Sequence, residues 1–242
     1  MFKAIILAAG KSTRMNSILP KVLHRINDKT LVQYVLDSVK MCDTDKIFVV
    51  VSNDSKNVRE AIKMDVIFVE QKEQLGTGHA VMQVEKYIED TDDIVVLCGD
   101  TPLITSETIN NIKEIHTKDN NAATILTTIL DNPMSYGRII RDNEKNIIGI
   151  VEEKDANDNQ KDIKEINSGI YFFKGKYLKE ALKKIESKNN SNEYYLTDTI
   201  KNITNAGHSV GSYTTKNYTE ILGVNTQDEL DKARKVLNET HK

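Results

Sequence analysis

The most constraining feature of this sequence is a regular alternation of short apolar runs with longer segments of helical spacing. Apolar runs rich in β-branched residues lie at 4–7, 47–51, 66–69, 94–97 and 122–126. Between them, apolar residues recur at helical spacing in 31–39, 58–64, 79–87 and 108–116. Strands that alternate with helices are typical of a parallel sheet whose crossover helices cover both faces. We therefore predict a three-layer α/β/α fold.

The pattern changes after about residue 128. Residues 136–155 favour a β-hairpin over a polar turn, and 167–173 favour a further strand, which together predict a small β-rich lobe. Residues 226–242 predict an amphipathic helix, with Thr226 as N-cap and Glu229 completing a capping box. We accordingly divide the chain into a domain of residues 1–225 and a C-terminal helix, residues 226–242, which is part of that domain or extends from it.

Composition excludes several classes of partner. The chain has 33 basic and 36 acidic residues, so it has no overall attraction for nucleic acid or anionic membranes. Cys42 and Cys98 have no metal-binding spacing, and reduced buried thiols suit the cytosol. No apolar run approaches the ~18 residues of a membrane span, and the N-terminus has no signal-peptide pattern. We expect a cytoplasmic protein that binds neither nucleic acid nor membranes; its oligomeric state stays open, a homo-oligomer included.

The first apolar run leads directly into a small, basic loop. Residues 8–10 are Ala-Ala-Gly, so a planar group or a phosphate can approach the backbone closely. Lys11, Arg14 and Lys21 then add positive charge, and exposed amides together with Arg and Lys suit a polyphosphate. The alternative is a tight turn with solvated charges. The pattern is neither GxGxxG nor GxxxxGK[ST], which disfavours Rossmann dinucleotide binding and P-loop hydrolysis.

Polar groups also follow two later apolar runs. The amide of Gln71 can both donate to and accept from the edge of a base, and Gly76-Thr77 open a helix whose first amides are available to a ligand. Asp100 follows the run 94–97, where a carboxylate suits Mg²⁺ together with phosphate oxygens and water. The alternatives are that Thr77 only caps its helix and that Asp100 only caps a helix or a turn.

Beyond these properties, the sequence resembles a known family. Its opening, "LAAGKSTRM…PK", is similar to the signature of sugar-phosphate nucleotidyltransferases, which use several different nucleotides. More specific similarities follow in order along nearly the whole chain: "EQLGTGHA" (73–80), "GDTPL" (99–103), "YGRI" (136–139), "IVEEKDA" (150–156), "EINSGIY" (165–171), "EYYLTD" (193–198) and "GVNTQDEL" (223–230). Together these motifs resemble the uridyltransferase half of the bacterial N-acetylglucosamine-1-phosphate uridyltransferases.

The resemblance implies a fold and a reaction. The fold would be that of nucleotide-diphosphosugar transferases, with a mostly parallel, mixed sheet and a β-rich lobe that binds the sugar. The reaction would convert UTP and N-acetylglucosamine 1-phosphate, the small-molecule partners, into UDP-N-acetylglucosamine and pyrophosphate, with Mg²⁺ as cofactor, for cell-wall precursor synthesis. Two alternatives remain: a pyrophosphorylase for another pair of sugar phosphate and nucleotide, and a catalytically silent module that binds nucleotide sugars.

The resemblance also implies a set of site residues. Arg14, Lys21 and Asp100 would be catalytic, with Lys21 at the α-phosphate and Arg14 at the departing pyrophosphate. Mg²⁺ would bind Asp100 and Asn225, although Asn225 has the alternative of merely capping the last helix. The substrate-binding residues would be Leu7, Ala8, Ala9, Gly10, Lys21, Gln71, Gly76, Thr77, Gly99, Asp100, Gly137, Glu152, Asn167, Glu193 and Asn225, with Tyr195 beside Glu193 as a further contact to the sugar.

The sequence differs from the family pattern in two ways, and each difference leads to an expectation. Ser12 stands where the opening signature usually has glycine, and we expect altered triphosphate affinity at most. Related bacterial enzymes often continue into a left-handed β-helix that acetylates glucosamine 1-phosphate. The six-residue repeats of such a β-helix do not occur within these 242 residues, so we expect no acetyltransferase activity from this chain.

Overall fold

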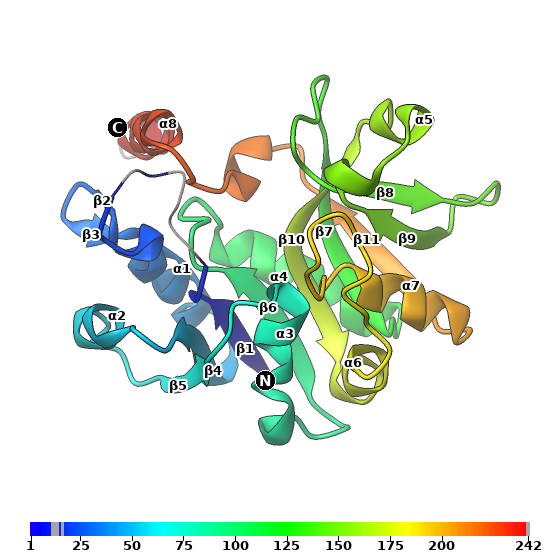
Figure 1. The fold of residues 1–242 in the computed structure, drawn as a ribbon, viewed down its shortest axis with the longest axis horizontal. Coiled ribbons are helices and arrows are strands. Elements are labelled where there is room, and N and C mark those ends of the chain that lie inside the picture. Colours follow the sequence, from blue (N-terminus) through cyan, green and yellow to red (C-terminus); the bar gives the residue numbers. More distant parts are fainter. Residues whose placement is uncertain (11–14, 16, 241–242) are drawn as a thin grey trace.

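A mixed central sheet organises the molecule and determines where its strand ends meet. The computed structural model describes residues 1–10, 15 and 17–240, and its main sheet has the strand order β11-β7-β10-β6-β1-β4-β5 (Figure 1). The strands of this path are β1 (Phe2–Leu7), β4 (Thr44–Ser52), β5 (Ile67–Gln71), β6 (Asp93–Cys98), β7 (Ala123–Ile129), β10 (Glu165–Lys174) and β11 (Val210–Thr214). Every neighbouring pair is parallel except those of β10, which runs antiparallel to β6 and β7. The sheet is thus mostly parallel, as predicted.

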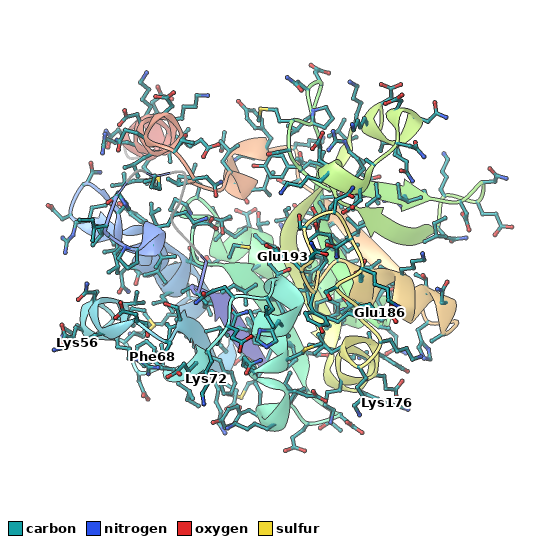
Figure 2. The ribbon with its side chains drawn as sticks, in the orientation of Figure 1. Lys56, Phe68, Lys72, Lys176, Glu186 and Glu193 are labelled. Atoms are coloured by element: carbon teal, nitrogen blue, oxygen red, sulfur yellow. The ribbon has the colours of Figure 1, made fainter. Side chains whose placement is uncertain are left out.

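Helices cover both faces of this sheet and give the predicted three layers. On β1, Ala4 and Ile6 pack on one face while Ile5 packs on the other, because successive side chains of a strand alternate. The first face is covered by α1 (Leu31–Lys40), α2 (Lys56–Ala61) and α4 (Ser106–Lys118). The second face is covered by α3 (Thr77–Met82), α6 (Gly175–Leu182) and α7 (Asp198–Asn205). Long charged side chains such as Lys56 and Lys176 point outward at the periphery (Figure 2).

A smaller lobe extends from one side of the sheet. The predicted hairpin is present as β8 (Arg138–Arg141) and β9 (Ile147–Val151), and β8 pairs with β10 where Arg138 lies opposite Ile166. The short helix α5 (Asp158–Lys161) continues this lobe (Figure 1). Because β8 pairs with β10, which is itself a strand of the main sheet, the lobe is held beside the sheet's carboxyl edge.

The last helix, α8 (Gln227–Thr240), begins with the predicted capping box. The Glu229 amide donates to Thr226 Oγ1 (3.2 Å), and the Thr226 amide donates to Glu229 Oε2 (3.0 Å). Leu230 and Ala233 of α8 pack with Ile26 of the short hairpin β2 (Arg25–Ile26) and β3 (Lys29–Thr30). The division of the chain at residue 225 stays a prediction.

Two predicted helices are shorter than expected. The helix predicted at 58–64 is α2, which ends at Ala61 because Ile62 adopts an extended conformation and its side chain is buried. The helix predicted at 79–87 is α3 followed by a separate 3₁₀ turn at Glu85–Tyr87. None of the described helices is long and apolar enough to cross a membrane.

Candidate active site

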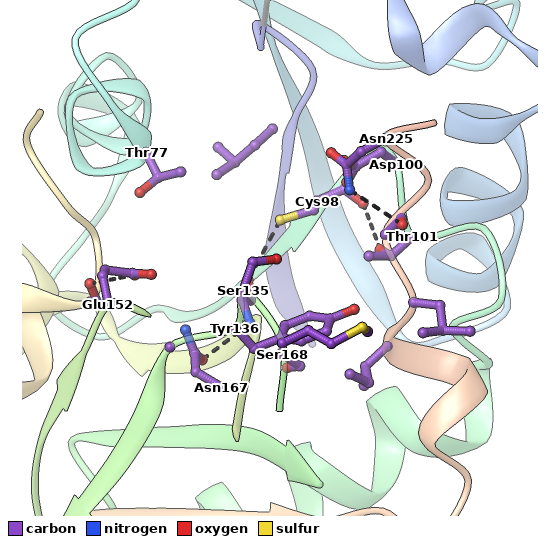
Figure 3. A pocket seen from close by; sticks show the side chains of 18 of the residues that line it. Thr77, Cys98, Asp100, Thr101, Ser135, Tyr136, Glu152, Asn167, Ser168 and Asn225 are labelled. Atoms are coloured by element: carbon purple, nitrogen blue, oxygen red, sulfur yellow. Dashed lines mark hydrogen bonds between the residues drawn. The ribbon is translucent and has the colours of Figure 1, made fainter. Parts of the chain in front are cut away.

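A cavity of about 470 Å³ opens at the carboxyl ends of the central strands. Leu7 and Cys98, which pair at the ends of β1 and β6, line its floor. Seven of the residues predicted for the site line this one cavity: Leu7, Thr77, Asp100, Gly137, Glu152, Asn167 and Asn225. Asp100 and Asn225 lie together on one side of it, and Glu152 and Asn167 lie away from them (Figure 3). The cavity therefore unites the residues predicted for the nucleotide with those predicted for the sugar.

Asp100 and Asn225 converge on a single positive charge. Lys21 Nζ donates to Asp100 Oδ2 and, over 2.9 Å, to Asn225 Oδ1. The side chains of Lys21 and Asp100 are 17% and 15% exposed, so little water screens the pair. The loop that carries Asn225 is fastened to Asp100 by the Val224 amide, which donates to the Asp100 carbonyl (2.8 Å). Two oxygens 125 positions apart in sequence thus face one cation.

The donor set of this corner fits a hard divalent cation held partly by its substrate. A carboxylate and an amide oxygen are ligands that Mg²⁺ accepts, and Mg²⁺ usually completes its shell with phosphate oxygens and water. Within the described part of the chain, no three His, Cys, Asp or Glu side chains cluster closely enough to hold a metal. The two oxygens of Asp100 and Asn225 would therefore need phosphate oxygens to bind Mg²⁺ well.

The alternative role of Asn225 as the helix cap is filled by its neighbour. Thr226 supplies the capping hydroxyl of α8. The side-chain oxygen of Asn225 instead faces Lys21, while its backbone amide donates to Glu229 Oε2 (2.6 Å). Glu229 therefore fixes the loop that presents Asn225 to the cavity.

The loop predicted for the nucleotide is tightly held against residues 194–196. Gly76 has φ +113°, and a Cβ at this position would lie 2.6 Å from the Tyr194 carbonyl oxygen, so only glycine fits. Thr77 Oγ1 accepts from the Leu196 amide (3.0 Å), and no side chain caps α3, so the helix-cap role considered for Thr77 is not observed. Gln71 is buried at the end of β5, where its Nε2 donates to the Gly76 carbonyl (3.1 Å).

The predicted sugar side contains a half-buried carboxyl group, that of Glu152. Burial raises the pKa of Glu152, while the Thr197 hydroxyl, which donates to Glu152 Oε1 (3.0 Å), opposes that rise. A Cβ on Gly137 would lie 3.4 Å from Glu152 Oε2, so the glycine leaves room beside this carboxyl. The Asn167 amide donates to the Gly137 carbonyl (2.9 Å), which places Asn167 next to Gly137. These three predicted residues form one wall.

The other predicted substrate-binding residues do not line this cavity: Ala8, Ala9, Gly10, Lys21, Gln71, Gly76, Gly99 and Glu193. Ala8 and Ala9 are buried, with the Ala8 amide donating to the Val50 carbonyl (2.8 Å). Glu193 is exposed (Figure 2). Arg14 and Ser12 lie outside the described residues. Roles in substrate binding for all of these residues stay predictions.

Several residues that line the cavity were not predicted from the sequence, although most of them lie within the motifs described above. Tyr136, Tyr171 and Thr197 belong to "YGRI", "EINSGIY" and "EYYLTD", and all three line the cavity. Lys232 of α8 also lines it, and no motif included it. The Cys98 thiol, at the end of β6, has a pKa raised to about 12 by burial and by the Asp100 charge, so it is a neutral packing group.

Comparisons with known proteins agree with this geometry. The model of the nucleotidyl transferase family matches residues 3–223. The bifunctional protein GlmU of Clostridioides difficile (strain 630) is 47% identical over 244 residues, covering 99% of this chain and 53% of that protein. GlmU of Alkaliphilus oremlandii (strain OhILAs) is 50% identical over 228 residues, covering 94% and 50%. The chain thus spans about half the length of the curated relatives it matches.

A solved structure extends the comparison to the fold. The crystal structure of UDP-glucose pyrophosphorylase complexed with UDP-glucose superposes with a TM-score of 0.78 at 18% identity, and covers 99% of both chains. At that identity the likeness shows the shared α/β fold alone. The family match, by contrast, spans most of the sequence and includes Asp100, Gly137, Glu152 and Asn167 of the cavity lining. The chain therefore belongs to the nucleotidyl transferase family, as the sequence motifs predicted.

Proposed function

We propose that this chain transfers a uridylyl group from UTP to N-acetylglucosamine 1-phosphate, releasing pyrophosphate and forming UDP-N-acetylglucosamine. One observation carries the proposal: a single cavity joins the Asp100 and Asn225 corner to the wall of Gly137, Glu152 and Asn167. A transferase of this kind needs a phosphate-binding corner and a sugar-binding wall within reach of each other. Relatives named GlmU, at 47% and 50% identity, support a sugar-phosphate nucleotidyltransferase, and the choice of substrates rests on the sequence motifs. We place the reaction in the cytoplasm, where its product would supply cell-wall precursors.

The chemistry of this reaction depends on positioning and on charge. The nucleophile is a phosphate oxygen of the sugar phosphate, which is already an anion, so no general base is required. Lys21 lies in the Asp100 corner and supplies positive charge where the α-phosphate of UTP would be attacked. Asp100 and Asn225 would hold Mg²⁺, which neutralises charge on the phosphates when it is bound. We assign the pyrophosphate to Arg14.

On the sugar side the chain provides hydrogen-bonding groups around a glycine. Gly137 leaves space for a ring, and Glu152 and Asn167 offer polar atoms to hydroxyl groups and to an acetamido group. Thr197 keeps the Glu152 carboxyl in place by donating to it. These groups would bind and orient the sugar phosphate so that its phosphate faces the Lys21 side of the cavity.

A substrate panel tests the proposal. Pyrophosphate release should be measured for UTP, dTTP, CTP and GTP, each with N-acetylglucosamine 1-phosphate and with glucose 1-phosphate, with and without Mg²⁺. We expect the highest kcat/KM for UTP with N-acetylglucosamine 1-phosphate, and no release without Mg²⁺. A higher kcat/KM for another pair would favour a different pyrophosphorylase. Binding of UDP-N-acetylglucosamine without any release would favour a silent binding module.

A further inference from the structure

Strand β10 carries Asn167 of the predicted sugar-binding wall (Gly137, Glu152 and Asn167). Its backbone has an irregularity that the proposed reaction does not explain. Asn167 lies opposite Thr127 of β7, and Tyr171 lies opposite Ile125, so four steps along β10 match two steps along β7. Gly169, between them, has φ +79°, a left-handed conformation that favours glycine. β-Bulges of this kind re-aim side chains next to active sites.

The bulge brings together two side chains that a regular strand would keep apart. Residues four apart on an extended strand are separated by roughly 13 Å along the strand. Here Asn167 Nδ2 donates to the Tyr171 hydroxyl oxygen over 2.8 Å. Ser168 stabilises the irregular backbone, because its hydroxyl donates to the Leu126 carbonyl (2.7 Å) and accepts from the Ile170 amide (3.1 Å).

The partners of the Asn167 side chain determine which way its amide faces. The Gly169 backbone N–H lies 3.1 Å from Asn167 Oδ1 and can only donate, so the oxygen must be on that side. The nitrogen therefore faces Tyr171, whose oxygen accepts from it. Each end of the amide keeps one bonding position, an N–H donor and an oxygen lone pair, for a ligand. Asn167 and Tyr171 are 6% and 2% exposed, and both line the cavity.

We propose that Tyr171 is a positioning residue that holds the Asn167 amide in a fixed orientation, in which one N–H donor and one oxygen lone pair remain for the sugar. The assignment of Asn167 to the sugar rests on the proposed function; the hold of Tyr171 on Asn167 rests on the contacts alone. Tyr171 keeps its hydroxyl proton, since burial and the nearby Glu152 carboxyl raise its pKa well above the usual value. Its oxygen therefore accepts as a neutral group at physiological pH.

The substitution Tyr171→Phe tests this role with little change in volume. Loss of one hydrogen bond should raise the KM for the sugar phosphate roughly 3- to 10-fold, while the KM for UTP changes less than about twofold. Tyr213→Phe is the matched control: the hydroxyl of Tyr213, on β11, accepts from Nδ2 of Asn111, on α4 (3.1 Å), and neither residue lines the cavity. This control should leave both KM values unchanged.

A double-mutant cycle shows whether Tyr171 acts through Asn167. In an Asn167→Ala background, Tyr171→Phe should add almost nothing to the KM for the sugar phosphate, because the group that it positions is absent. A role of Tyr171 in packing alone would instead add its full effect in both backgrounds. An additive result would therefore overturn the inference.

A measurement without substrate separates this inference from the proposed function. The side-chain amide resonances of Asn167, assigned by their loss in Asn167→Ala, should shift and exchange faster with water in Tyr171→Phe but not in Tyr213→Phe. Unchanged resonances in Tyr171→Phe would overturn the positioning role. Failure of the wild-type chain to use N-acetylglucosamine 1-phosphate would overturn the proposed function instead, and the amide resonances would still decide the role of Tyr171.

Discussion

At the scale of single residues, the site is organised by one shared charge. Lys21 Nζ bonds both Asp100 and Asn225, so the two oxygens face a point where a cation is stable. A divalent cation bound there with nucleotide would take over these oxygens and leave the ammonium to face a phosphate. The ion pair of Lys21 would then give way to contacts with the metal and a phosphate.

Removing the negative charge of this corner should slow turnover severely. We predict that Asp100→Asn lowers kcat by roughly two orders of magnitude or more, since a metal ion neutralises charge that develops in the transition state. Asn225→Ala should lower kcat less, because water can replace a neutral ligand. Asp93→Asn, at the opposite end of β6, is the control and should keep normal kcat. Near-normal turnover of Asp100→Asn across a Mg²⁺ titration would refute the metal assignment.

The amide of Gln71 provides a test of base recognition. If Gln71 hydrogen-bonds uracil, Gln71→Ala should weaken the binding of UTP by about 1–3 kcal/mol, the cost of one or two hydrogen bonds. The KM for UTP should rise accordingly. Gln83→Ala is a suitable control, because Gln71 Nε2 and Gln83 Nε2 each contact a ring nitrogen of His79 (3.1 and 3.2 Å). Gln83, however, lies at the C-terminal end of α3, opposite the end that Gly76 and Thr77 form. Steady-state kinetics of both variants provide the test. If Gln71→Ala left the kcat and the KM for UTP unchanged, Gln71 would not belong to the site.

The half-buried Glu152 carboxyl predicts a pH-dependent difference in stability. Burial, then the nearby carboxylates of Asp155, Asp198 and Glu193, raise its pKa above the ordinary 4.5. The folded state therefore holds this proton more tightly than the unfolded state. The associated stabilisation is complete below about pH 4.5 and is lost as the pH rises through the raised pKa.

Glu152→Gln removes this titration while keeping the shape of the side chain. The variant should gain thermal stability relative to wild type at neutral pH, and the gain should disappear as the pH falls below 4.5, where wild-type Glu152 is protonated. Melting temperatures of both proteins between pH 4 and 8 provide the measurement. A difference that does not change with pH would show that the carboxyl group has no raised pKa.

At the scale of elements, the contact between the Gly76 loop and residues 194–196 joins the two sides of the cavity. Gly78 also meets the Tyr194 carbonyl oxygen, at 2.9 Å from its ideal Cβ position, and its own amide donates to that oxygen (2.8 Å). Thr197, in the same segment, bonds Glu152. A loop predicted for the nucleotide is therefore packed against the segment that orients a predicted sugar residue.

A glycine substitution in this loop should be more harmful than backbone strain alone explains. Gly76→Ala should destabilise the fold by about 1–2 kcal/mol for its positive φ, plus roughly 1–3 kcal/mol for overpacking against Tyr194. Gly207→Ala separates the two effects, because Gly207 has φ +80° but no atom within 4 Å of its ideal Cβ. Urea unfolding of both variants should show the larger loss for Gly76→Ala; equal losses would exclude the steric contribution.

The sequence predicted the buried elements better than the peripheral ones. The runs around Phe48–Val51 and Ile94–Leu97 are buried on both sides, so their apolar character is continuous and visible. Strand β11 is only partly buried and contains Gly211 and Ser212, so its sequence lacks such a run. The bulge at Gly169 was also not foreseen, because it depends on how β10 pairs with β7.

At the scale of the whole molecule, the cavity lies where the parallel strands and the β-rich lobe meet. Strand β10 borders β6 on one side and pairs with β8, so the strand that carries Asn167 also holds the lobe against the sheet. The motifs predicted residues that line this cavity, such as Asp100 and Asn225. The way in which Lys21 bonds both of them depends on distances across the fold, which no local pattern contains.

A crystal structure of the complex with UDP-N-acetylglucosamine would show whether one cavity binds both substrates side by side. We predict the uracil beside Gln71 and the loop of Gly76, the phosphates near Lys21 and Asp100, and the acetamido sugar against Gly137, Glu152 and Asn167. A nucleotide sugar bound outside this cavity, or bound with its sugar away from Glu152 and Asn167, would refute the proposed function.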